Sequence, residues 1–259
     1  MCLAGCGRVA FDPHADGGNR DGAATDAQTI ASLQPLAWWK LDETSGTDLH
    51  DSVGALDGFL VPGGNTTLPT WAAVGGNDPS DYAVFFEGDG DQAPIAMPSI
   101  LHNLSAVTVA GWIYPLTVTA DATARCIFDK GTGGASGWAF VISPSQAPSG
   151  DGSLGFLLFG ATWTMYVITG PNTISANRWT HLAMTWDGSA TTTNIHFYVD
   201  GAEVAPVASM PAGGPRVDDS SNGGTINCNS GITQPGMYDD IILFDRVLTP
   251  GEVATVYGS

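Results

Sequence analysis

The sequence predicts an all-β protein, an antiparallel β-sandwich of jelly-roll type. Residues 178–201 read as two strands joined by a polar turn, because apolar and polar side chains alternate along residues 194–199 and each run ends at an Asp-Gly pair. Period-two alternation bounded by Asp-Gly is typical of a hairpin, and a hairpin needs a larger sheet around it to be stable. The chain also has 34 Gly and 16 Pro among its 259 residues, more than long helices tolerate.

Further strand-like runs fill the chain in order. They are residues 36–43, 58–60, 81–88, 104–115, 137–143, 153–159, 163–169 and 236–246. The run 104–115 is largely apolar on both of its alternating faces, as expected inside a sandwich. Residues 207–222 are rich in Pro, Gly, Asp and Ser and predict a long exposed loop. Near the end, Thr249, Pro250 and Glu252 predict a short helix with a capping box.

The charge balance limits the function classes. Lys and Arg total 8 and Asp and Glu total 26, for a net charge of −18. This argues against a nucleic-acid partner and against electrostatic docking on an anionic membrane, because too few cations are present to neutralise phosphates. The acidity has two interpretations: a soluble surface outside the cytoplasm, or carboxylates that hold Ca²⁺. No apolar run is long enough to predict a transmembrane helix.

The N-terminal residues 1–34 are interpreted as a leader and flexible tether, and residues 35–259 as one domain. Leu3-Ala4-Gly5-Cys6 matches a bacterial lipobox, which predicts lipidation of Cys6. The alternative is a chance match, since the residues before Cys6 cannot supply a basic region and an apolar region. The polar stretch that follows suits a tether behind a lipid anchor, with a helical turn near residues 24–33.

Two cysteines remain beyond the leader, Cys126 and Cys228. An even pair in an exported domain predicts a disulfide. The alternative is two separate buried thiols, because free Cys is common in protein cores. No C-x-x-C or Cys/His cluster indicates a zinc site.

Several short motifs occur in a characteristic order. They are W-x-L-D-E at 39–43, I-x-x-K-G at 127–131, W-x-H-x-A-x-T-W-D-G at 179–188, Y-V-D-G at 198–201 and D-D-I-I-L-F-D-R at 239–246. Together they resemble the laminin-G-like branch of the concanavalin A-like lectin/glucanase jelly rolls, over residues 36–257. One departure is Glu87, which stands where the family has Asp. The resemblance implies the same β-sandwich that the strand pattern predicts.

The resemblance also implies a structural Ca²⁺ that joins the first strand, a Gly turn and an Asp of the last strand. The corresponding candidates are Asp42 or its carbonyl, Gly88 or Asp91, and Asp240. Ca²⁺ takes about six to eight oxygen ligands, which carboxylates and turn carbonyls supply. The alternative is that these acids cap turns and face water.

Aromatic residues supply candidates for sugar binding. Of eight Trp, four lie in strands that match core positions of the family, while Trp71, Trp138 and Trp163 are less well explained, and Trp163 with Tyr166 could line a sheet face. Trp138, Trp163 and Tyr166 are therefore the candidate ligand-binding residues, with packing in the core or on a sheet as the alternative.

Catalysis is not predicted. The E-x-D-x-x-E pattern of related β-glucanases and the G-x-S-x-G of serine hydrolases are both absent. His181 and His196 are interpreted as hydrogen-bonded sheet residues. The expected function is a non-catalytic module at the bacterial cell surface or outer membrane that binds a glycan or an extracellular protein. The alternatives are a structural or adhesion module without a small ligand and, less in keeping with the motifs, a glycoside hydrolase.

Overall fold

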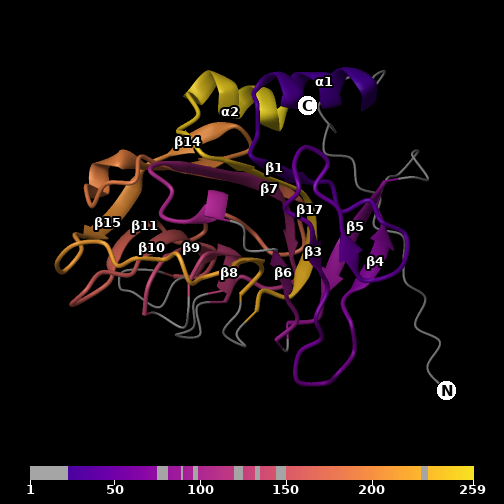
Figure 1. Cartoon of the computed structure of the whole chain (residues 1–259), viewed down its shortest axis with the longest axis horizontal. Helices are drawn as coiled ribbons and strands as arrows, with labels where there is room; N and C mark the ends of the chain where they lie inside the picture. The colour runs from indigo at the N-terminus through magenta and orange to yellow at the C-terminus, as the bar shows by residue number, and fades with distance from the viewer. Residues whose placement is uncertain are drawn as a thin grey trace.

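The computed structural model describes residues 23–74, 81–88, 90–95, 99–119, 125–131, 135–143, 150–228 and 233–259. Two antiparallel sheets lie face to face, and two helices lie on the outside of one of them (Figure 1). The predicted β-sandwich is therefore confirmed.

The first sheet lies beneath the helices. Its strands are β1 (Ala37–Trp39), β4 (Thr70–Ala73), β5 (Tyr82–Phe86), β7 (Val107–Pro115), β12 (Thr180–Trp186), β13 (Ile195–Val199), β14 (Ala202–Val204) and β17 (Gly236–Phe244). They run in the order β14-β13-β12-β7-β17-β5-β4, and β1 pairs with β17. The predicted hairpin is β12 and β13, in which Leu182 lies opposite Val199 and Trp186 opposite Ile195.

The second sheet carries the other half of the core. Its strands are β2 (Asp48–Leu49), β3 (Gly58–Phe59), β6 (Ala93–Ile95), β8 (Arg125–Asp129), β9 (Trp138–Ile142), β10 (Leu154–Leu158), β11 (Met165–Thr169), β15 (Pro206–Met210) and β16 (Gly224–Ile226). They run in the order β15-β11-β10-β9-β8-β16-β6-β3-β2. Two short 3-10 helices, η1 (Ser99–Leu101) and η2 (Thr192–Asn194), lie in the connections.

The main core fills the space between the sheets. Along β7, Val107, Val109 and Ile113 belong to this core, while Ala110 and Trp112 belong to clusters on the outer face. This alternation is the period-two pattern of a strand covered on both sides. The helices thus explain why residues 104–115 lack a polar face.

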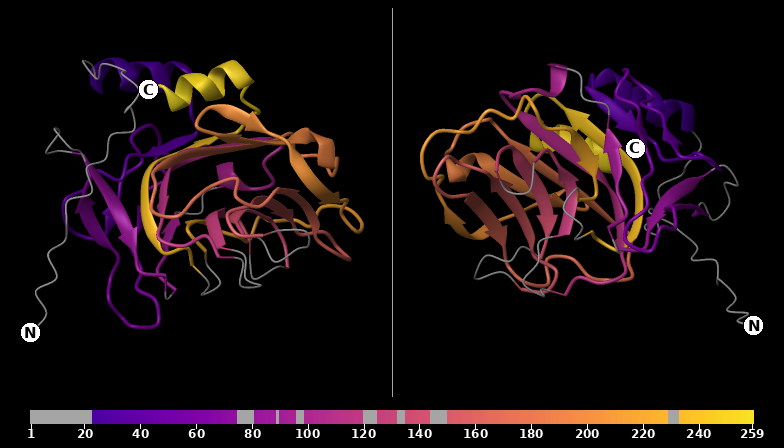
Figure 2. Two further views of the ribbon diagram at one scale, coloured as in Figure 1. Left: turned by 180° about the vertical axis from the view of Figure 1, so that it is seen from behind. Right: turned by 60° about the horizontal axis from the view of Figure 1, so that its bottom comes forward.

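The two helices, α1 (Ala23–Ser32) and α2 (Pro250–Tyr257), cover the outer face of the first sheet, as the left view of Figure 2 shows. The predicted capping box of α2 is present, since Thr249 accepts from the Glu252 N–H and Glu252 accepts from the Thr249 N–H. Ile30 of α1 is only 2% exposed, because it packs in the same cluster as α2. Part of the stretch assigned to the tether is therefore a helix packed on the domain. In the described part of the chain, no helix has the length and apolarity to cross a membrane.

The predicted exposed loop at 207–222 is only partly a loop. Its first residues belong to β15, which pairs with β11. Asp219 and Asn222 are buried rather than exposed. Both engage the buried Lys130 from the end of β8, a partner 89 and 92 residues away in sequence. Local composition predicted exposure because it carries no information about such a distant partner.

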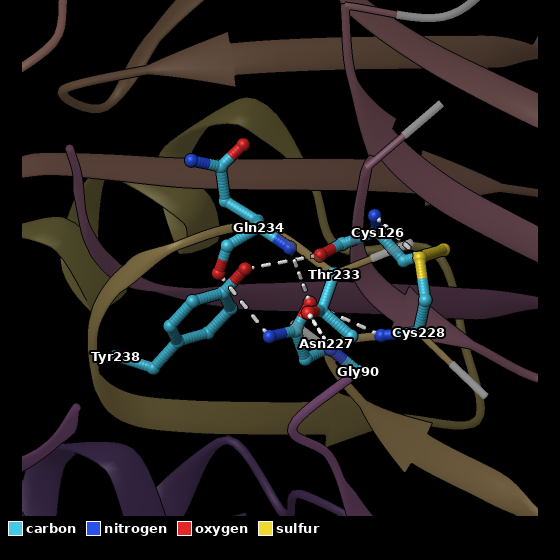
Figure 3. Close-up of a disulfide and its surroundings, with 7 residues drawn as sticks. All are labelled: Gly90, Cys126, Asn227, Cys228, Thr233, Gln234 and Tyr238. Atoms are coloured by element: carbon cyan, nitrogen blue, oxygen red, sulfur yellow. Dashed lines mark hydrogen bonds between the residues drawn. A yellow bond between two sulfur atoms is a disulfide. The ribbon is translucent and has the colours of Figure 1, made fainter. Parts of the chain in front are cut away.

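The predicted disulfide between Cys126 and Cys228 is present (Figure 3). It ties β8 to the segment that follows β16. The same region is held by the Tyr238 hydroxyl, which donates to the Cys126 carbonyl at 3.0 Å, and by Asn227, whose side chain accepts from the Gln234 N–H at 2.8 Å. The disulfide therefore belongs to a buried network rather than to an isolated cross-link.

Candidate functional site

Trp163, one of the predicted ligand-binding residues, lies in the turn between β10 and β11. It is 54% exposed, although its indole N–H is already satisfied by the Pro211 carbonyl at 3.1 Å. A methyl group placed on Gly213 would collide with three atoms of the indole ring. The ring therefore lies across the backbone of Gly213, which has no side chain to push it away. The protein supports the indole on one side and leaves the other side to solvent.

Two further aromatic side chains, Tyr166 and Phe159, lie on the outer face of the second sheet, in or next to the strands that flank the Trp163 turn. Tyr166 of β11 lies opposite Leu157 on one side and Met210 of β15 on the other. Phe159 and Tyr166 are half-buried and pack against a cluster that includes Leu157 and the disulfide. Cross-strand partners share a face of an antiparallel sheet. We call the exposed face of the Trp163 indole the Trp163 platform.

Trp138 is a correction to the predicted ligand-binding set. It is only 1% exposed and stacks between Phe128 and Phe156, with ring centroids 5.7 and 6.4 Å away. All five residues of β9 are buried, so both faces of this strand are covered. Trp138 therefore stabilises the core and presents no ring face to a ligand.

A second group of side chains gathers at the first sheet. Asp42 follows β1, Asp81 precedes β5 and Asp239 lies in β17, and one carboxylate oxygen of each lies within 4.8 Å of the others. Asp239 is only 3% exposed. Burial raises its pKa well above the ordinary value, and the carboxylates of Asp240, Asp81 and Asp42 raise it further. Three convergent carboxylate oxygens are the donor type that a hard divalent cation prefers.

The residues predicted to bind calcium lie in different environments in the structure. Only Asp42 belongs to this carboxylate cluster. The buried Asp91 accepts hydrogen bonds from the N–H groups of Gly63 and Glu87, both at 2.9 Å, and so organises a turn. Gly88 has φ +92° and packs closely against Pro235.

Asp240 has a different environment from its neighbour Asp239. It accepts from the Trp38 indole N–H at 2.8 Å, and burial raises its pKa to about 6 although that hydrogen bond opposes the rise. The bulge of β17 against β7 lies between Asp239, which pairs with Trp112, and Ile242, so Asp240 lies within the bulge. Asp239 and Asp81 are the members of the cluster that sequence reasoning did not select. Asp239 belonged to the D-D motif, whereas the sequence around Asp81 contained no signal for a metal site.

The two strand histidines are sheet residues, as predicted. His181 is buried, its ring packs edge-on against Trp112, and its backbone N–H donates to Asp200 at 3.0 Å. His196 forms an exposed hydrogen bond with Glu203 at 2.7 Å. Neither residue belongs to the Asp42, Asp81 and Asp239 cluster.

A match to a protein-family model shows which superfamily the chain belongs to. The model Laminin_G_3, described as Concanavalin A-like lectin/glucanases superfamily, matches residues 87–254. The chain belongs to this superfamily. Within the superfamily the fold is shared by lectins and by glucanases, so membership alone does not distinguish binding from catalysis. No curated protein sequence matches the chain.

Solved structures share this superfamily fold. The binding domain of Paraclostridial Mosquitocidal Protein 1 aligns with a TM-score of 0.60 at 13% identity, over 86% of this chain and 51% of that one. The receptor-binding domain of botulinum neurotoxin C/D mosaic serotype gives 0.62 at 14%, over 87% and 51%. Our chain therefore spans about half of those toxin domains.

A smaller relative aligns over almost its whole length. Domain 4 of a GH43 extracellular arabinanase from Geobacillus stearothermophilus, solved in complex with arabinotriose, gives a TM-score of 0.58 at 16% identity. The alignment covers 86% of this chain and 98% of that domain. At this identity the likeness establishes a common fold.

Proposed function

We propose that this protein is a non-catalytic binding module and that the Trp163 platform receives a sugar ring of a glycan. The observation that carries the proposal is the orientation of Trp163, whose ring rests on Gly213 and whose N–H is bonded to Pro211 while 54% of the residue stays exposed. The negative face of an indole attracts the weakly positive C–H groups of a sugar face. Because the N–H is occupied within the protein, a ligand meets the ring through its face.

The structural neighbours support a glycan as the ligand class. Besides the arabinanase domain with arabinotriose, the botulinum neurotoxin serotype D ligand-binding domain was solved with N-acetylneuraminic acid. A related toxin domain was solved with rat synaptotagmin II, a protein. Both ligand classes therefore occur on this fold, and the exposed indole favours the glycan for this chain.

The proposed location is outside the cytoplasm, at the bacterial cell surface or outer membrane. The disulfide supports it, because structural disulfides persist in oxidising compartments. Lipid anchoring through Cys6 remains a proposal, since Cys6 lies outside the described residues. Mass spectrometry of the mature protein tests it: a lipid on Cys6 supports the anchor, and a mature protein that keeps its unmodified N-terminus excludes it.

A glycan array tests the binding function with three proteins: wild type, Trp163→Ala and Phe59→Ala. Phe59 is a matched control, because it is 51% exposed but lies on β3, towards the other edge of the second sheet. The proposal predicts discrete hits for wild type and Phe59→Ala that are lost in Trp163→Ala. An array without hits contradicts it and favours the interaction-module alternative.

We also propose that Asp42, Asp81 and Asp239 hold a structural Ca²⁺. A cation would relieve the mutual repulsion of the three carboxylates, which otherwise raises the pKa of the buried Asp239. Binding to the folded state alone stabilises a protein by about 2.7 kcal/mol when the ion is at about 100 times its dissociation constant.

Thermal melts with Ca²⁺ and with EDTA test the metal site. The proposal predicts that Ca²⁺ raises the melting temperature of wild type and of Asp48→Asn, an exposed acid on β2, but not of Asp239→Asn. An equal response of Asp239→Asn and wild type contradicts it.

A further inference from the structure

The Trp163 platform depends on a segment of chain that is distant in sequence. The turn that carries Trp163 is bonded to residues 211–216 through backbone groups as well as through the indole. Thr162 donates its N–H to the Gly213 carbonyl at 2.8 Å, and Gly213 donates to the Trp163 carbonyl at 3.1 Å. Whatever fixes residues 211–216 therefore also fixes the indole.

A buried ionic network holds that segment. Arg216 donates to the Asp219 carboxylate at 2.6 Å, and the Lys130 ammonium donates to the Asp219 carbonyl at 2.9 Å. Asp219 is 0% exposed, and Lys130 is nearly as buried. The ammonium also reaches the other carboxylate oxygen of Asp219, at 3.4 Å. One carboxylate is thus shared by two cations, one from β8 and one from the segment itself.

Arg216 joins this network to the core. Its guanidinium donates to the Leu104 carbonyl at 2.7 Å and lies over the Trp186 ring, with Cζ 4.9 Å from the ring centroid. Separately, the Arg216 backbone forms an isolated antiparallel β-bridge with Gly160, at the start of the turn that carries Trp163. A planar guanidinium can make these contacts together, whereas an ammonium cannot stack and bond in the same way.

We infer that Arg216, held by Asp219 and Lys130, is the positioning residue of the Trp163 platform. It fixes residues 211–216 against the core, and these residues in turn present the indole face. The inference rests on the proposed role of Trp163 in binding, but it concerns the order of the site before any ligand arrives. It predicts that loosening Arg216 disorders the turn locally without unfolding the sandwich.

Amide hydrogen exchange by NMR tests the inference. The reporters are the Thr162 and Gly213 amides, and the reference is the Phe159 amide, which donates to the Gly137 carbonyl at 2.9 Å rather than to residues 211–216. In Arg216→Lys and Arg216→Gln we expect the reporters to exchange at least about tenfold faster relative to the reference.

A matched arginine serves as the control. Arg178 pairs with Asp200 at 2.6 Å, the same separation as in the Arg216 pair, but at an exposed site. Arg178→Gln should leave the reporter amides unchanged. Acrylamide quenching attributed to Trp163, measured as the difference from Trp163→Phe, should rise in the Arg216 variants only.

The outcomes separate this inference from the binding proposal, because neither measurement uses a glycan. If the Arg216 variants lower the melting temperature while reporter and reference amides accelerate equally, Arg216 is a general structural residue and the inference is overturned. Arg216→Lys keeps the charge and so guards against loss of folding in Arg216→Gln. A failed glycan array would contradict the proposed ligand and leave the amide result to stand by itself.

Discussion

The buried His181 makes the fold sensitive to acid in a way that can be measured. Its side chain is 1% exposed and packs between Trp112 and Tyr257, with ring centroids 5.3 and 5.7 Å away. Its Nδ1 has no hydrogen-bond partner in the described part of the chain. Burial therefore lowers the pKa of His181 from 6.5 to about 3. Asp200, which follows the adjacent strand β13, accepts hydrogen bonds from the His181 backbone N–H and from Arg178.

Proton linkage gives the sign and size of the change in folding stability that His181 causes as the pH falls. Since the folded pKa lies below the unfolded one, the unfolded chain takes up the proton first as the pH falls. Stability from the neutral His181 is full above pH 6.5 and is lost progressively towards pH 3. Each pH unit within this window costs about 1.4 kcal/mol, so roughly 2 to 3 kcal/mol disappears between about pH 7 and about pH 4.5.

Urea unfolding of wild type, His181→Leu and His50→Gln at about pH 7 and about pH 4.5 measures this loss of stability. His181→Leu removes the titrating group and should lose roughly 2 to 3 kcal/mol less than wild type on acidification. His50 is exposed, so His50→Gln should follow wild type. The reasoning is refuted if His181→Leu and wild type lose the same stability between the two pH values.

Three further predictions concern stability. Asp219→Asn should lower the free energy of unfolding by about 3 to 5 kcal/mol in urea melts, because it leaves the buried Lys130 and the partly buried Arg216 with a neutral partner. A loss below about 1 kcal/mol would contradict the ionic account. Gly111→Ala should cost about 1 to 3 kcal/mol, since its methyl group meets the backbone and side chain opposite the β17 bulge, whereas Gly251→Ala on α2 meets nothing within 4 Å and should cost nothing. Replacing Cys126 and Cys228 by Ser should cost about 4 to 5 kcal/mol, because the bond closes a loop of 102 residues; an unchanged melting temperature would argue against this loop-closure account.

Local sequence predicted the elements whose cause is local. The Asp-Gly pairs and the alternation along residues 194–199 determine the β12–β13 hairpin, and Thr249 and Glu252 determine the capped α2. The Cys pair was predicted by elimination and compartment, since only Cys126 and Cys228 remained beyond the leader. In each case the deciding residues lie close together or are few.

The features that sequence did not predict depend on distant partners. Trp138 is in the core because both faces of β9 are covered, which its own alternation cannot reveal. Asp219 is buried because Lys130 reaches it from another strand. The carboxylate cluster draws one acid from each of three separated segments, so Asp81 carried no local signal. Predicting a site of this kind requires the order of the strands in the sheet, and the resemblance to a family gives that order only coarsely.

The central claim is that a glycan stacks on the indole of Trp163. Calorimetric titration of the strongest array hit into wild type, Gly213→Ala and Gly170→Ala tests it most directly. Gly213→Ala retains the Trp163 side chain but displaces its indole, while the methyl group of Gly170→Ala finds only an ordinary contact with Val207 at 3.5 Å. The account predicts at least about tenfold weaker binding for Gly213→Ala and unchanged binding for Gly170→Ala. Equal affinity for all three proteins would contradict it and place the glycan elsewhere on the sandwich.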